Sequence, residues 1–73
     1  MKNSLFKAYH SNCKTLFIMI RDSKAKNENV SYGYVVGFLS GLYHMVLNYG
    51  DYELSNYIID HNNKLIDRFN KIY

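Results

Sequence analysis

The 73-residue sequence contains no proline, one cysteine and no charged residue between positions 30 and 50. Without proline, nothing obliges a helix to break, so long helices are favoured over many short strands. The lone cysteine, Cys13, excludes a disulfide within the chain and fits a reducing compartment. A chain of this length forms one domain, residues 1–73, whose small core needs very close packing or a second copy of the chain.

A long apolar segment is also missing near the N-terminus, because Lys7, Lys14 and Arg21 interrupt it at intervals of seven residues. A signal peptide needs such a segment, so we expect a cytoplasmic protein. Lysine outnumbers arginine by seven to two, and Asn, Ile and Tyr are frequent. This bias is typical of AT-rich genomes, such as those of low-GC bacteria, their phages and mobile elements.

The residues that are present predict an all-α protomer of three helices. The first helix spans about residues 5 to 26 and begins after Ser4 as its N-cap. The run from Leu16 to Ile20 is apolar throughout, so a strand is the alternative there. Residues 23–29 are polar and form the expected loop. The apolar residues of the first helix recur at intervals of three and four, which places them on one face: Leu5, Phe6, Tyr9, Cys13, Leu16, Phe17 and Ile20.

Two more helices are predicted, over about residues 31–49 and 52–73. Asn29 or Ser31 caps the earlier one, Gly50 ends it in the left-handed conformation, and Asp51 caps the last helix. The core face of the last helix contains Leu54, Ile58, Leu65, Phe69 and Ile72. Asn62 falls in the same stripe, where it either fixes the register or oligomeric state or lies solvated at the edge.

Small and polar residues share one side of the predicted helix 31–49. A glycine within a helix costs about 1 kcal/mol relative to alanine, so three glycines spaced by four indicate a close approach of another backbone. The other sides are apolar, and two neighbouring helices of one chain cannot cover them all. We therefore expect a homodimeric or larger helical bundle whose interface contains Asn62 and the small or polar residues Gly33, Gly37, Ser40, Gly41, His44 and Asn48.

A membrane span through residues 30–50 is a further alternative, because the segment is uncharged and repeats the Gly-x-x-x-Gly spacing of membrane helix pairs. Its flanks, basic before and acidic after, also fit a cytoplasmic N-terminus. Against it, His44, Asn48 and several tyrosines make the segment less hydrophobic than a typical span.

Catalytic and metal-binding patterns are scarce. The glycines lie in an apolar helix with no following Lys-Ser or Lys-Thr, which argues against a phosphate-binding loop. His10 and Cys13 are close enough on one helix for a thiolate–imidazole pair, but Cys13 lies on the predicted core face. A zinc site drawn from His10, Cys13, His44 and His61 lacks the clustered spacing of true sites. We expect no enzymatic activity, metal or cofactor.

Charge is segregated along the chain. Residues 1–28 contain six Lys or Arg and two acids, whereas residues 51–73 contain three basic and four acidic residues. The basic residues Lys7, Lys14 and Arg21 share one side of the first helix with Ile18, which faces away from the core. A surface that combines basic and apolar groups predicts binding of a larger, acidic protein. The alternative is a nucleic-acid-binding dimer that uses the same helix.

Together these patterns predict a small interaction module that forms a homodimer and binds a larger protein as a regulator, inhibitor or assembly factor. Small proteins of phages and mobile elements often act in this way, which supports the class by analogy.

Overall fold

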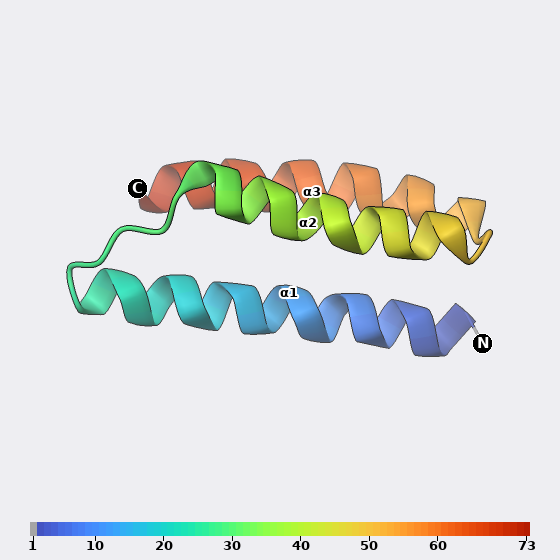
Figure 1. Cartoon of the computed structure of the whole chain (residues 1–73), viewed down its shortest axis with the longest axis horizontal. Helices are drawn as coiled ribbons and strands as arrows, with labels where there is room; N and C mark the ends of the chain where they lie inside the picture. Colours follow the sequence, from blue (N-terminus) through green and yellow to red (C-terminus); the bar gives the residue numbers. More distant parts are fainter. Residues whose placement is uncertain (1) are drawn as a thin grey trace.

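The computed structural model describes residues 2–73, with side chains from residue 4 onward, and consists of three long helices (Figure 1). The helices are α1 (Lys2–Ala25), α2 (Tyr32–Asn48) and α3 (Tyr52–Ile72). The chain runs up, down and up, so that α1 and α3 are parallel to each other and α2 is antiparallel to both. The predicted all-α fold of three helices is confirmed for this part of the chain, which contains no strand.

The first helix is longer at its start and shorter at its end than the sequence predicts. It already includes Lys2, so Ser4 lies within the first turn and the predicted N-cap is wrong. At the other end Asn27 takes a left-handed conformation with φ 59°, and the N–H of Glu28 donates to the carbonyl of Ser23 at 2.8 Å. This is the Schellman arrangement that usually uses glycine. Because α1 runs to Ala25, residues 23–25 of the predicted loop are helical, and that part of the prediction is wrong.

The boundaries of α2 and α3 follow the predicted caps. Ser31 precedes α2 and its Oγ accepts a hydrogen bond from the N–H of Tyr34 at 3.0 Å. Gly50 has φ 81°, the left-handed conformation expected of the residue that ends α2. Asp51 caps α3, because its Oδ1 accepts from the N–H of Leu54 at 3.0 Å. The tight turn between the two helices is therefore confirmed.

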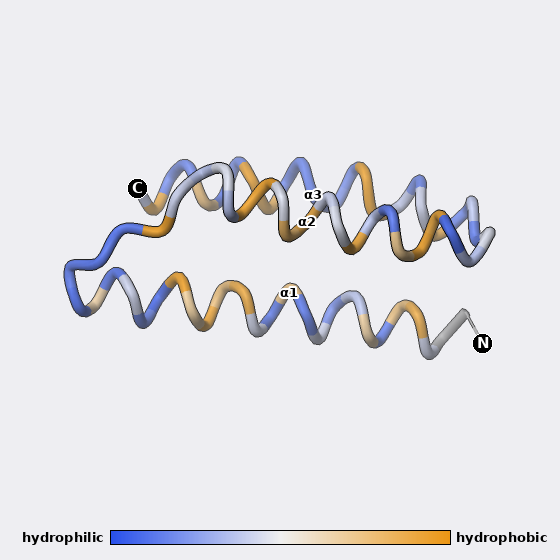
Figure 2. The backbone as a smooth tube through the Cα atoms, in the orientation of Figure 1, coloured by the Kyte–Doolittle hydropathy of each residue, from blue (hydrophilic) through white to orange (hydrophobic). Residues whose placement is uncertain are grey.

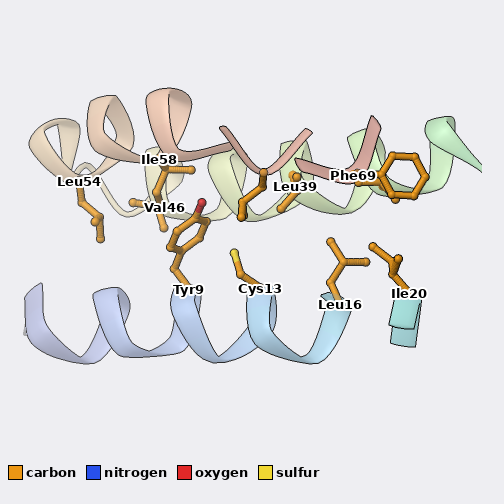
Figure 3. Packing of buried hydrophobic residues seen from close by; sticks show 11 residues of the cluster. Tyr9, Cys13, Leu16, Ile20, Leu39, Val46, Leu54, Ile58 and Phe69 are labelled. Atoms are coloured by element: carbon orange, nitrogen blue, oxygen red, sulfur yellow. The ribbon is translucent and has the colours of Figure 1, made fainter. Parts of the chain in front are cut away.

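The core lies along the axis between the three helices (Figure 3). Leu16 to Ile20 is helical, so the strand alternative is wrong. Phe6 is also misplaced by the prediction: its ring is 42% exposed and packs on the rings of His10 and Tyr57 near the start of α1. The buried apolar residues are Tyr9, Cys13, Leu16, Ile20, Val35, Leu39, Val46, Leu54, Ile58, Leu65 and Phe69.

Asn62 joins all three helices from within this core. Its side chain is only 8% exposed, so the solvated alternative is wrong. The amide accepts from the hydroxyl of Tyr9 on α1 at 2.6 Å and donates to the carbonyl of Leu39 on α2 at 2.9 Å. These hydrogen bonds are made inside one chain, whereas the glycines of α2 are exposed.

The hydropathy of the helices differs as Figure 2 shows. Along α3, hydrophobic and hydrophilic residues alternate in the manner of an amphipathic helix, whereas α2 is mostly apolar or weakly polar. Nevertheless α2 has only 17 residues. Among the described residues, no helix combines the length and apolar character needed to cross a membrane, which contradicts a span through residues 30–50.

Candidate interaction surfaces

A groove of about 500 Å³ runs between α1 and α3. Its apolar lining comes from both helices and includes Phe17 and Ile18 of α1 and Leu65 and Ile72 of α3. Ile18 is 39% exposed, whereas its neighbours Leu16 and Ile20 are buried, and it lines the groove together with Phe17. The groove therefore offers an apolar floor that remains accessible from the surface.

The charged side chains that line this groove are all basic. Lys14 and Arg21 come from α1, as predicted, and Arg68 comes from α3. The guanidinium carbon of Arg68 lies 4.7 Å from the centre of the Phe17 ring, a cation–π contact that spans the two helices. Lys7 is exposed but does not line the groove. The structure thus brings together three of the four predicted protein-binding residues and adds Arg68.

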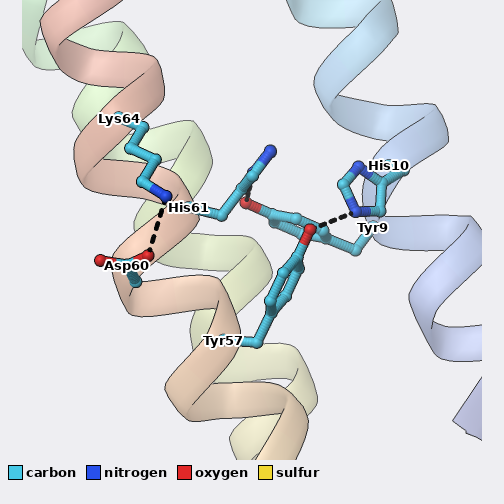
Figure 4. Close-up of polar contacts among 6 residues, drawn as sticks. All are labelled: Tyr9, His10, Tyr57, Asp60, His61 and Lys64. Carbon is cyan, nitrogen blue, oxygen red and sulfur yellow. Dashed lines mark hydrogen bonds and ion pairs between the residues drawn. The ribbon is translucent and has the colours of Figure 1, made fainter.

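A cluster of aromatic and histidine side chains joins α1 and α3 beside the His10 and His61 end of the groove, and Figure 4 shows it from close by. The rings of His10 and His61 lie 4.9 Å apart, centre to centre, and Tyr57 stacks on His61 at 5.5 Å. The Nε2 atom of His10 lies 2.9 Å from the hydroxyl of Tyr57. At the other end, the ammonium group of Lys24 donates to the carbonyl of Ile72 at 2.7 Å. Side-chain contacts between α1 and α3 are therefore present near both ends of the groove.

The hydrogen bonds around Tyr9 determine the tautomer of His61. Tyr9 is fully buried and its single hydroxyl hydrogen goes to Asn62, so Nδ1 of His61, 2.8 Å from the same oxygen, must carry a hydrogen and donate it. Burial raises the pKa of Tyr9 and lowers the pKa of His61, which the nearby His10 lowers further. The folded chain therefore disfavours the protonated form of His61.

This shift predicts that acid weakens the fold through His61. Because its folded pKa lies below the ordinary value of 6.5, the unfolded chain takes up a proton first as the pH falls. The stabilising contribution is complete above about pH 6.5 and is lost as the pH falls towards the lowered pKa. We expect the melting temperature of the wild type to drop between pH 7.5 and pH 5.5. The melting temperature of the His61→Gln variant should drop less over the same interval. Equal drops in the two proteins would contradict this assignment.

Other titratable and charged groups near His61 also affect how the melting temperature depends on pH. His10, Tyr9 and Tyr57 contact it from α1 and α3, and the Asp60–Lys64 ion pair, 3.3 Å long, lies beside it on α3. A His10→Gln variant measured in parallel separates the part of the pH dependence that arises from repulsion between the two histidines.

The glycines of α2 face open space. A Cβ atom added at Gly33, Gly37 or Gly41 would meet no atom within 4 Å. The expected close approach of another backbone is therefore wrong for the single chain, and these glycines serve no packing within it. Ser40, His44 and Asn48 are exposed on the same helix. The exposed uncharged surface of α2, which we call the α2 face, consists of Gly33, Gly37, Ser40, Gly41, His44, Met45 and Asn48.

The residues that the sequence analysis considered as a nucleophile or as zinc ligands lie in different environments. Cys13 is buried, and burial raises the pKa of its thiol, which disfavours the reactive thiolate at neutral pH. His10 has Tyr57 as its hydrogen-bond neighbour. His44 is exposed on α2, and its ring contacts that of Tyr43. Within residues 2–73 as described, no three His, Cys, Asp or Glu side chains are grouped as metal ligands would be.

Arg68, Phe17 and the His10–His61 pair were not assigned to a surface by the sequence analysis. Their spacing contains a signal in retrospect, because the lining residues on α1 and α3 recur at intervals of three and four, as one side of a helix does. Recognising it requires knowing that α1 and α3 are parallel neighbours.

Comparison with known proteins adds no relative: no protein-family model, curated protein or solved structure matches the chain.

Proposed function

We propose that this protein is a non-enzymatic interaction module that self-associates through the α2 face and binds a larger protein through the basic and apolar side of α1. In this role it acts as a regulator, inhibitor or assembly factor. The observation that supports the proposal best is the uncharged, solvent-open surface of α2.

The α2 face differs from an ordinary exposed helix side, which carries charged residues on soluble proteins. The α2 face contains the exposed Met45, and its neighbours on α2 include the exposed residues Tyr32 and Tyr34. Aromatic residues and methionine are enriched at protein interfaces, and charged residues are depleted from interface cores. Glycines with nothing above them allow a second helix to approach the backbone closely, which offsets their cost in helix stability.

Two measurements on the full chain test the two halves of the proposal. Sedimentation at micromolar concentration is expected to show a dimer or larger assembly, and a monomer throughout would overturn self-association. For the second half, the tagged protein is incubated with a lysate of cells that carry its gene. A protein retained after nuclease treatment and high-salt washes is the expected result, because those steps remove nucleic acid and nonspecific ionic contacts.

A further inference from the structure

We infer that the groove between α1 and α3 binds one amphipathic helix that carries acidic residues along both edges of its apolar stripe. This inference rests on the proposed function, since it specifies the chemistry of the larger partner. The geometry of the groove and its charge support the choice of occupant.

The length of the groove corresponds to a short helix. On α1 its lining runs from His10 to Arg21 and on α3 from His61 to Ile72. Eleven residue steps at 1.5 Å per residue amount to about 16 Å, or three turns of helix. The two walls are parallel helices, so a third helix lying between them would pack its apolar side chains on both, as helices in bundles do.

The charge of the groove selects an acidic occupant. Lys14, Arg21 and Arg68 line it, and no Asp or Glu is among its lining residues. The Nε atom of Arg21 also lies 3.6 Å from Oδ1 of Asp22, and because both side chains are exposed, solvent screens this ion pair. Carboxylates on the two edges of a bound helix would pair with these cations, while its apolar residues cover Ile18 and Phe17.

Synthetic peptides provide a defined probe. We use an 18-residue helix-forming peptide whose central three turns carry leucines at intervals of three and four with glutamates beside them, so that both of its ends extend past the groove. A second peptide replaces each glutamate by lysine, and a third scrambles the first so that the stripe is lost. Binding to the full chain is followed by fluorescence anisotropy. We expect the glutamate peptide to bind at least about tenfold more tightly than the other two, a difference of ~1.4 kcal/mol.

Matched variants locate the binding site. Ile18→Asp and Arg68→Glu are each expected to raise the Kd of the glutamate peptide by about tenfold or more. Ile59→Asp is the control for Ile18, because Ile59 is 44% exposed on α3 but does not line the groove. Lys7→Glu is the control for Arg68, with a comparable charge change outside the groove. Both controls should change the Kd by less than about threefold, as surface changes away from a contact do.

Several outcomes would overturn the inference. Equal binding of all three peptides, or equal losses in the control variants, would show that the groove does not select its occupant. Stronger binding of a DNA or RNA oligonucleotide at the same cations would assign the surface to nucleic acid. Loss of self-association in Ile18→Asp would make the groove an interface between copies of this chain. If Ile18→Asp does not fold, the Kd of the glutamate peptide for Arg68→Glu, a change at an exposed position, tests the inference by itself.

The lysate experiment separates failure of the groove from failure of the proposed function. A protein retained equally by the wild type, Ile18→Asp and Arg68→Glu would overturn the groove assignment while leaving the interaction module intact. No retained protein after nuclease and salt washes would overturn the binding of a larger protein altogether.

Discussion

Replacing Asn62 by leucine is expected to lower the free energy of unfolding by about 1–3 kcal/mol, because the hydroxyl of the buried Tyr9 loses its acceptor and the carbonyl of Leu39 loses a donor. A domain of this size has a small reserve of stability, so the change removes a large fraction of it. Urea unfolding followed by circular dichroism measures the effect.

The control is Asn63→Leu, which makes the same substitution at the adjacent, exposed position and should change stability by less than about 0.5 kcal/mol. Adding Tyr9→Phe to Asn62→Leu should recover part of the loss, because removing both partners leaves fewer buried polar atoms unsatisfied. If Asn62→Leu is as stable as the wild type, the network between the three helices contributes nothing to the fold.

Gly37→Leu is expected to abolish self-association without harming the protomer. Leucine is the better helix former by about 0.8 kcal/mol, and no atom of the same chain lies near the new side chain. In an assembly formed through the α2 face, the leucine would instead separate the two backbones and weaken the dimer by about a hundredfold or more. Sedimentation equilibrium together with thermal unfolding distinguishes the two effects.

The matched control is again Asn63→Leu, which adds the same side chain to an exposed position of α3. A Gly37→Leu protein that is more stable than the wild type but equally associated would show that the α2 face stays in solvent, and self-association would then use another surface. A variant that unfolds would contradict the open space around Gly37.

Local sequence determined most of the secondary structure. Ser31, Gly50 and Asp51 mark the ends of α2 and the start of α3 because caps and left-handed turns depend on a few adjacent residues. The start of α1 was predicted less well, because Ser4 is as compatible with a first helical turn as with a cap. Periodicity likewise identified the core face of α3, including the position of Asn62.

Only the tertiary structure decided what these faces contact. The predicted glycine stripe is correct as a pattern, yet nothing in the sequence says whether another helix of the same chain covers it, and none does. Asn62 obtains its partners from α1 and α2, and Arg68 meets Phe17 across two helices. Helical periodicity fixes which side of one helix is apolar, whereas the partners of that side depend on how distant segments pack, and this is decided by the whole chain at once.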